Sequence, residues 1–292
     1  MIFRHQIFLI AILLMAMRSL QAQAQEDFPY PSVPAELTTP QERADYVVRH
    51  YWDNINFQDT TLIHRPGMIE QGFVNFIDLL PHLGKLELVG WQVFTEKALG
   101  KNATYDNYLK GLAERYLYTA TSPMRNDSLY CHLLAAINQL PTTSEEEREK
   151  NLFLITQLGK NKVGDVATNF EYTDEKGNKH QLHDVAADYT LLYMYDPDCE
   201  TCHQVEEEMK KEPLLQQAAA PTGIHQAAAP TGIHQATAHI AIVRVNAMAR
   251  KDLWKSYYFR SFPTLYLLDK SKRVVLKDTE LGKIVSFLRE NR

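Results

Sequence analysis

Two cysteines three residues apart, Cys199 and Cys202, stand where an apolar stretch of the chain gives way to a helix-favouring one. The preceding residues, 190–195, are short and rich in aromatics, which favours a β-strand. Residues 203–215 are rich in Glu, Lys, Gln, Met and Leu, which favour a helix. A strand that leads directly into a helix places Cys199 at the helix N-terminus, where unpaired N–H groups and the helix dipole stabilise a thiolate. Cys202 follows about one turn later, so the spacing predicts reversible thiol–disulfide exchange.

Two other kinds of site use a pair of cysteines with this spacing. A structural zinc ion needs four ligands, and the only other cysteine, Cys131, is isolated, while no histidines form a second paired cluster. The run from Cys199 to His203 also matches the attachment pattern of c-type haem, although its flanks have the character of a strand and a helix. The thiol–disulfide interpretation is favoured over both, and we expect neither a metal nor a cofactor.

The N-terminus has the three parts of a secretory signal peptide. Arg4 and His5 precede an apolar run over residues 7–17, and the small-residue pattern Ala22-Gln23-Ala24 follows. We therefore expect residues 1–24 to be removed. No later stretch reaches the roughly eighteen apolar residues that a membrane span requires. The sequence predicts a soluble, exported protein located in the periplasm.

Length and charge limit the number of domains and the kind of partner. The chain has 292 residues, for which two domains are the default expectation. Its formal net charge of −5 would become −7 on loss of residues 1–24, because Arg4 and Arg18 lie there and no acid does. A mildly acidic surface argues against nucleic acid as a partner.

Residues 25–160 have the periodicity of an all-helical domain. Thr39-Pro40-Gln41-Glu42 has the layout of a capping box, with proline at the first helical position. Apolar residues at helical spacing follow it, and they continue through further predicted helices at 67–80, 86–99, 104–118, 126–140 and after 144. Cys131 lies beside the apolar stripe of one helix, which predicts a buried, inert thiol. This region shows no constellation of catalytic residues.

After residue 160 the pattern changes to short strands. A β-hairpin is predicted around the turn at 174–178, followed by the strand and helix of the cysteine pair, a strand at 239–246, a short helix at 250–259, strands at 261–269 and 273–277, and a closing helix at 279–288. A nine-residue sequence at 217–225 is repeated without change at 226–234, which indicates a lengthened surface loop. The predicted fold class is thus α+β with two domains, an all-α domain (25–160) followed by an α/β sandwich with a central mixed sheet (161–292).

Three motifs together resemble a known family. They are the lead-in Val163–Phe170, the sequence Asp196-Pro197-x-Cys199-x-x-Cys202, and Phe262-Pro263-Thr264 at the start of a strand. In combination they resemble the thioredoxin fold, specifically the exported TlpA/ResA-like thiol–disulfide oxidoreductases. The N-terminal half, including residues 122–126, resembles a helical domain of unknown function found ahead of such modules in exported Bacteroidetes proteins.

The resemblance implies a role for several residues. Cys199 matches the attacking cysteine and Cys202 the resolving one, while Pro263 matches a cis-proline whose neighbouring backbone, at Phe262, pairs with the substrate. Two positions depart from the family: Asp198 stands where relatives commonly have Trp, and Tyr193 stands where thioredoxin has a buried acid. No replacement for that acid is evident from the sequence.

The charges around Cys199 indicate a direction for the exchange. Asp196, Asp198 and Glu200 place negative charge near the thiolate and His203 offsets part of it when protonated. We expect the acids to dominate, which gives a poor oxidant that works as a reductase or isomerase. Its partners would be protein or peptide disulfides and a membrane-bound or exported thiol electron donor. The alternative is a non-catalytic binding module on a thioredoxin scaffold.

Overall fold

The structure, a computed structural model, describes residues 28–65, 67–174, 176–216 and 239–291. The predicted signal peptide and the duplicated segment 217–234 lie outside these residues. The chain divides into two compact units between Asn151 and Leu152. The division falls inside a helix and upstream of the predicted domain boundary at residue 160. Among the described residues, no helix is both long and apolar enough to cross a membrane.

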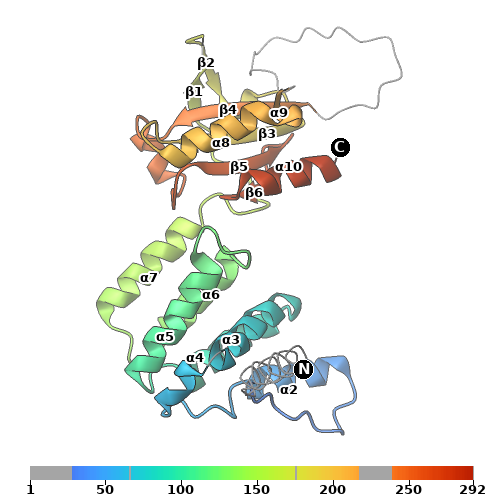
Figure 1. The fold of residues 1–292 in the computed structure, drawn as a ribbon, viewed down its shortest axis with the longest axis vertical. Helices are drawn as coiled ribbons and strands as arrows, with labels where there is room; N and C mark the ends of the chain where they lie inside the picture. Colours follow the sequence, from blue (N-terminus) through green and yellow to red (C-terminus); the bar gives the residue numbers. More distant parts are fainter. Residues whose placement is uncertain (1–27, 66, 175, 217–238, 292) are drawn as a thin grey trace, which may run out of the picture. The chain divides into compact units, whose positions relative to one another are not determined.

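The described part of the first unit is built from helices (Figure 1). They are α2 (Pro40–His50), η1 (Thr60–His64), α3 (Met68–Leu79), η2 (Leu80–His82), α4 (Leu86–Ala98), α5 (Ala103–Ala113), η3 (Glu114–Tyr118), α6 (Asp127–Ile137) and α7 (Glu145–Leu158). The predicted helices are confirmed, with one difference. The helix expected over 104–118 ends its α-helical part at Ala113 and finishes as the π-helical turn η3.

Side-chain caps fix the helix ends. At α2 the predicted capping box is present: the Glu42 N–H donates to Thr39 Oγ1 at 3.3 Å, and the Thr39 N–H donates to Glu42 Oε2 at 3.1 Å. Asn102 and Asn126 cap α5 and α6 in the same sense, each accepting N–H donors of the first turn. The local sequence therefore decides where these helices begin.

An aromatic cluster forms the core of this unit. The Trp52 ring lies 5.2 Å from those of Phe76 and Phe94, and the Trp91 ring lies 5.6 Å from that of Phe76, with centroids as the reference points. All four side chains are buried. Aromatic rings at these separations stabilise a core by their buried area and by their edge-to-face contacts.

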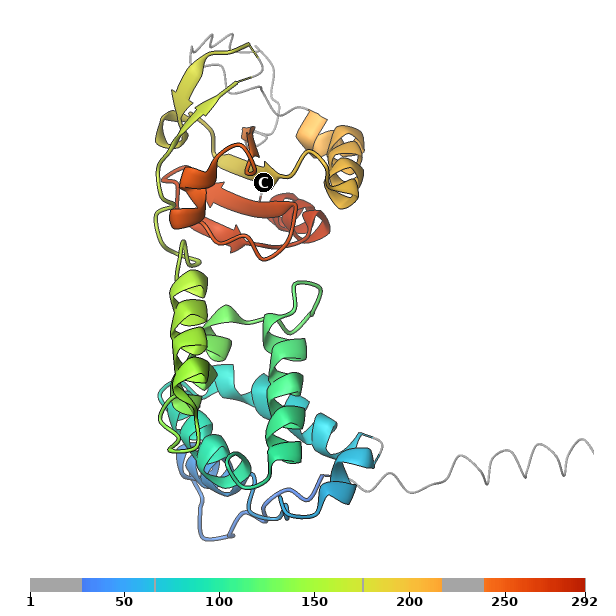
Figure 2. The ribbon, with the colours of Figure 1, turned by 90° about the vertical axis from the view of Figure 1, so that its left-hand side faces the viewer.

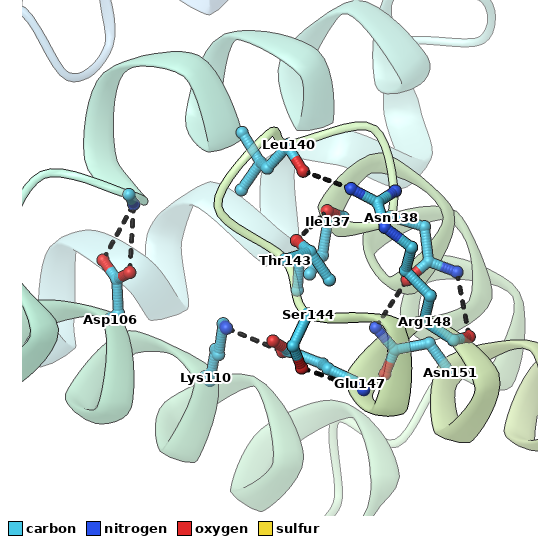
Figure 3. A network of polar contacts seen from close by, with 11 residues as sticks. Asp106, Lys110, Ile137, Asn138, Leu140, Thr143, Ser144, Glu147, Arg148 and Asn151 are labelled. Carbon is cyan, nitrogen blue, oxygen red and sulfur yellow. Dashed lines mark hydrogen bonds and ion pairs between the residues drawn. The ribbon is translucent and has the colours of Figure 1, made fainter.

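A network of polar contacts ties the first two turns of α7 to α5 and α6 (Figure 3). The buried amide of Asn151 donates to Asn138 Oδ1 at 2.8 Å, and the hydroxyl of Thr143 donates to the carbonyl of Ile137 at 2.6 Å. Two further links are Arg148 to the Leu140 carbonyl at 2.6 Å and Lys110 to Glu147 at 2.7 Å. Each link satisfies a backbone or side-chain group of a neighbouring element, so the network holds the helices in place. Cys131, predicted to be buried beside this region, is half-buried instead.

The second unit contains a four-stranded mixed sheet. Its elements are β1 (Glu171–Thr173), β2 (Lys179–Gln181), η4 (Leu182–Asp184), β3 (Tyr189–Tyr195), α8 (Glu200–Lys211), α9 (Pro213–Gln216), β4 (Ile240–Asn246), η5 (Lys251–Lys255), β5 (Thr264–Asp269), β6 (Val274–Lys277) and α10 (Leu281–Glu290). The strand order is β4-β3-β5-β6, with β3 and β4 parallel and the other pairs antiparallel. The hairpin β1–β2 forms a separate two-stranded sheet.

Two elements of this unit differ from their predictions. The segment predicted as a short helix over 250–259 contains only the 3₁₀ turn η5. The helix expected to have Cys199 at its N-terminus and to continue to residue 215 begins at Glu200, as predicted, but ends at Lys211, where Glu212 takes an extended conformation before α9. The residue after Glu212 is Pro213, and a residue before proline is disfavoured in the helical conformation, which accounts for the break.

Alternating residues of β3 face two different layers. Leu191 and Tyr193 belong to the core formed with α8, α9 and α10, whereas Leu192 and Met194 belong to the core formed with residues 167–187 and 247–259. In Figure 2, α8 and α10 lie on one side of the strands, and η5 lies on the other. The period of two along a strand thus divides its apolar side chains between both layers. The predicted fold class, an all-α domain followed by an α/β sandwich, is confirmed.

Candidate active site

Two chain segments meet at one end of the four-stranded sheet. In the antiparallel pairing of β3 with β5, Met194 lies opposite Thr264, so the end of β3 and the start of β5 are neighbours. The chain after β3 makes a turn into α8, and the chain before β5 carries Phe262 and Pro263. Sheet register therefore brings together two motifs that are about sixty residues apart in the sequence.

Cys199 is the N-cap residue of α8. Its backbone is extended, and its Sγ accepts a hydrogen bond from the Cys202 N–H at 3.2 Å. The Cys199 side chain is half-buried rather than enclosed in the core. Its sulfur takes the place that an oxygen of Ser or Asp takes in ordinary caps, which directs the sulfur at the unpaired N–H groups of the first turn.

The residues before β5 approach the same sulfur. The Cys199 Sγ lies 3.6 Å from the carbonyl oxygen of Phe262, which accepts its S–H. The peptide bond between Phe262 and Pro263 is cis. Phe262 is partly buried, and its ring stacks with that of Phe259 at a centroid separation of 5.5 Å. Of the two residues predicted to bind substrate, Phe262 therefore contacts the half-buried sulfur of Cys199, and Pro263 follows it in the chain.

Cys202 has a different environment. It is 1% exposed, and no disulfide joins it to Cys199. Burial, and after it the contact with Cys199, raise the pKa of the Cys202 thiol to about 12. The pair therefore consists of one half-buried sulfur and one buried sulfur that retains its proton.

Tyr193 lies beneath the pair, at the position where thioredoxin has a buried acid. Its hydroxyl donates to the carbonyl of Cys202 at 2.8 Å. Burial raises the pKa of Tyr193, and the neighbouring Cys202 and Glu206 act in the same direction, so the phenol remains neutral. Tyr193 thus holds the backbone of the first turn of α8 through this hydrogen bond, and it does not replace the carboxylate of the buried acid.

Sequence reasoning missed Glu206. It lies four residues after Cys202 on α8, and its Oε1 is 3.9 Å from Nε of Arg244 on β4. Its charge reaches the hydroxyl of Tyr193. The i,i+4 spacing from Cys202 was a signal that could have identified it, since residues four apart share a helix face.

The acids predicted to tune the site occupy different positions. Asp196 is half-buried, and its Oδ1 accepts the N–H of Asp198 at 2.9 Å, while its carbonyl accepts the N–H of Cys199 at 3.2 Å. Asp196 acts on the Cys202 thiol in two opposite directions: a backbone hydrogen bond lowers the pKa of Cys202, and the negative charge of the carboxylate raises it by less. Asp198, Glu200 and His203 are exposed. Asp196 therefore also stabilises the turn between β3 and Cys199. The sequence did not indicate these two hydrogen bonds.

Within the described part of the chain, no group of three or more His, Cys, Asp or Glu side chains is placed to hold a metal ion. The two thiols of the site and the neighbouring carboxylates therefore form no metal-binding cluster there.

A mixed sheet of this order, a cysteine pair at the start of α8 and a cis-proline before β5 define a thioredoxin-like protein. The comparison with protein families matches residues 15–161 to the Domain of unknown function (DUF5106), which spans half of the chain. The chain also resembles a thioredoxin-like protein from Bacteroides caccae at 30% identity, with 91% of this chain and 99% of that chain covered and a TM-score of 0.66. The chain belongs to this family of thioredoxin-like proteins with an N-terminal DUF5106 region, as its motifs predict.

Two other solved structures are similar over a smaller part. A C-terminal domain of a protein from Bacteroides fragilis is 27% identical and covers 44% of this chain and 98% of its own, with a TM-score of 0.34. A thioredoxin domain of a thiol–disulfide oxidoreductase from Bacteroides vulgatus is 20% identical and covers 44% of this chain and 97% of its own, with a TM-score of 0.33. The comparison with curated proteins finds no match.

Proposed function

We propose that this protein is an exported thiol–disulfide oxidoreductase that acts on protein or peptide disulfides in the periplasm. The observation that carries the proposal is the position of the Cys199 sulfur. It is half-buried, it caps a helix, and it lies 3.2 Å from the Cys202 N–H and 3.6 Å from the Phe262 carbonyl. The hydrogen bond from the Cys202 N–H suits a nucleophilic thiolate at Cys199. The Phe262 carbonyl lies just before the start of β5, and the end of a strand is a place where the backbone of a substrate can dock.

The reaction follows from the chemistry of two unequal thiols. The Cys199 thiolate attacks one sulfur of a substrate disulfide, which forms a mixed disulfide and releases the other substrate sulfur as a thiolate. Cys202 then attacks the Cys199 sulfur and gives up its proton to the departing substrate sulfur. The substrate gains two electrons and becomes a dithiol, and the Cys199–Cys202 pair becomes a disulfide. An exported or membrane-bound thiol donor restores the pair.

The buried state of Cys202 favours a reductase or isomerase. A resolving thiol that retains its proton attacks slowly, because the thiolate is the reactive form. The mixed disulfide then persists long enough for a second substrate thiol to attack it, which is the step that isomerisation requires. The same burial argues against covalent haem attachment, since a thioether at Cys202 would have to fit within the core.

The reduction potential of the Cys199–Cys202 couple tests the proposal. It is measured by thiol trapping across redox buffers on protein lacking residues 1–24, with Cys131→Ser as the variant that removes the third thiol. A reversible two-electron couple near about −270 mV supports a reductase, and one near about −180 mV supports an isomerase. A value near about −120 mV would indicate an oxidase and contradict the proposed direction. Absence of a reversible couple overturns the proposal in favour of a binding module.

A further inference from the structure

A buried ion pair lies next to the residues proposed to bind substrate. Nε of Arg260 is 3.4 Å from Oδ2 of Asp278, and the two side chains are only 5% and 6% exposed. Taking two charges out of water costs free energy for each ion, a cost that their attraction only partly offsets. An ion pair in such a place is weak evidence for stability, so a role in fixing geometry has to be considered.

The sheet register puts both partners at the active-site end. Arg260 is two residues before Phe262 in the chain. Asp278 directly follows β6, and the antiparallel pairing of Lys277 with Tyr266 brings that end of β6 toward the start of β5. The ion pair therefore connects the segment before the Phe262–Pro263 peptide bond with the residue that follows β6.

Further contacts fix both sides of this connection. The hydroxyl of Thr264 donates to the carbonyl of Ser261 at 2.7 Å, which closes the segment 261–264 on itself. Asp278 has a positive φ of 47°, a conformation that Asp and Asn adopt more readily than most residues. The position of the Asp278 carboxylate is thus set by the left-handed backbone conformation of Asp278 as well as by its contact with Arg260.

We propose that the Arg260–Asp278 ion pair positions the Phe262–Pro263 edge against Cys199 and so sets the site where the backbone of a substrate peptide docks. Arg260 and Asp278 are positioning residues, because they act through the backbone of residues 261–263. The part of the inference that concerns substrate docking rests on the proposed function. The part that concerns the contact between Cys199 and Phe262 does not.

The test compares Asp278→Asn with the wild-type protein. Asparagine keeps the size and tolerates the positive φ, so the change removes mainly the charge. The first measurement is single-turnover reduction of a synthetic peptide with one intramolecular disulfide by the pre-reduced protein. We expect the half-saturating peptide concentration to rise by about ten- to a hundredfold with little change in the limiting rate, because docking is lost and the chemistry is retained.

The second measurement does not need a substrate. Iodoacetamide should alkylate Cys199 faster in Asp278→Asn at a fixed pH, since a displaced Phe262 carbonyl no longer accepts the thiol proton. A purely structural ion pair would lower the denaturation midpoint and change neither quantity in the folded protein. Glu212→Gln is the matched control, because Glu212 forms an ion pair with Arg289 at 3.0 Å near the opposite end of α8.

The outcomes separate this inference from the proposed function. If the wild-type protein reduces no disulfide but Asp278→Asn still alkylates faster, the positioning role stands and the proposed function fails. If the wild-type protein is active and Asp278→Asn matches it in both measurements, the positioning role is wrong. Should Asp278→Asn fail to fold, Arg260→Gln, which removes the charge of the other partner, is measured in the same way and judged by the same two results.

Discussion

The two units use their polar side chains in different ways. In the helical unit these groups cap helices or join neighbouring elements, as Asn126 does at α6 and Asn151 does at Asn138. In the thioredoxin-like unit several polar groups converge on one end of the sheet, where Cys199 contacts the Phe262 carbonyl and Tyr193 contacts the carbonyl of Cys202. The first arrangement stabilises a fold, whereas the second also surrounds the half-buried sulfur of Cys199.

The difference indicates where chemistry is to be sought. A buried polar group that has a hydrogen-bond partner serves the structure, whereas a half-buried thiol at a helix N-terminus is the kind of group in which reactivity is expected. The helical unit has a dense aromatic core and ordinary caps, which explains why its sequence predicted helices and no catalytic residues. The proposed activity should accordingly depend on residues of the second unit alone.

Replacement of the attacking sulfur gives the largest expected effect. Cys199→Ser should reduce disulfide exchange to background, because a serine hydroxyl is not ionised at neutral pH and cannot attack a disulfide. Cys202→Ser should still attack and should accumulate the mixed disulfide, seen on a non-reducing gel or by mass spectrometry. Cys131→Ser is the control and should keep full activity. Exchange that survives in Cys199→Ser would place the activity elsewhere.

The aromatic core tests whether the units act separately. Trp52→Ala should destabilise the helical unit by about 3–5 kcal/mol, since it leaves a cavity among buried rings. Denaturation followed by circular dichroism measures the loss. We expect the rate of disulfide exchange under folding conditions to stay unchanged, because Trp52 lies outside the thioredoxin-like unit. A parallel fall in exchange would show that the helical unit takes part in the reaction.

The pH dependence of alkylation distinguishes the two sulfurs. With a pKa of about 12 in place of the ordinary 9.0, about one Cys202 thiol in a thousand is ionised at pH 9. Iodoacetamide at pH 9 should thus modify Cys199 long before Cys202 in the reduced protein, as peptide mass spectrometry can show. Equal labelling of both cysteines would contradict the burial of Cys202.

The same raised pKa affects stability. The native state holds the Cys202 proton more tightly than the unfolded chain does, so this contribution is complete below pH 9 and is lost as the pH rises toward 12. The urea midpoint of the reduced wild-type protein should fall between pH 8 and pH 10 by more than that of Cys202→Ala.

The smallest expected effect comes from removal of single hydrogen bonds, one in each unit. Tyr193→Phe removes the contact with the Cys202 carbonyl, and Asn126→Ala removes the cap of α6. Each should lower the free energy of unfolding by about 1 kcal/mol. We expect only Tyr193→Phe to move the reduction potential of the cysteine pair. A shift in Asn126→Ala of the same size would mean that the potential follows overall stability rather than local structure.

Much of the fold was determined by local sequence. The capping box at Thr39 and Glu42 fixes the start of α2 within a few residues, because those side chains satisfy N–H groups of their own helix. The strand and helix around Cys199 followed from residue type and periodicity in the same way. The segment at 250–259 was predicted as a helix but forms only η5, and its Leu253 and Tyr257 are instead buried in the core beneath the sheet.

Only the tertiary structure decided what surrounds the two sulfurs. Sequence spacing placed Cys199 at a helix N-terminus, but the approach of Phe262 depends on the pairing of β3 with β5 across about seventy residues. The burial of Cys202, the hydroxyl of Tyr193 beneath it and the Arg260–Asp278 ion pair depend likewise on packing between distant segments. Local patterns are read from neighbours in the chain, whereas desolvation and charge pairing arise from neighbours in space, and these exist only once the sheet has formed.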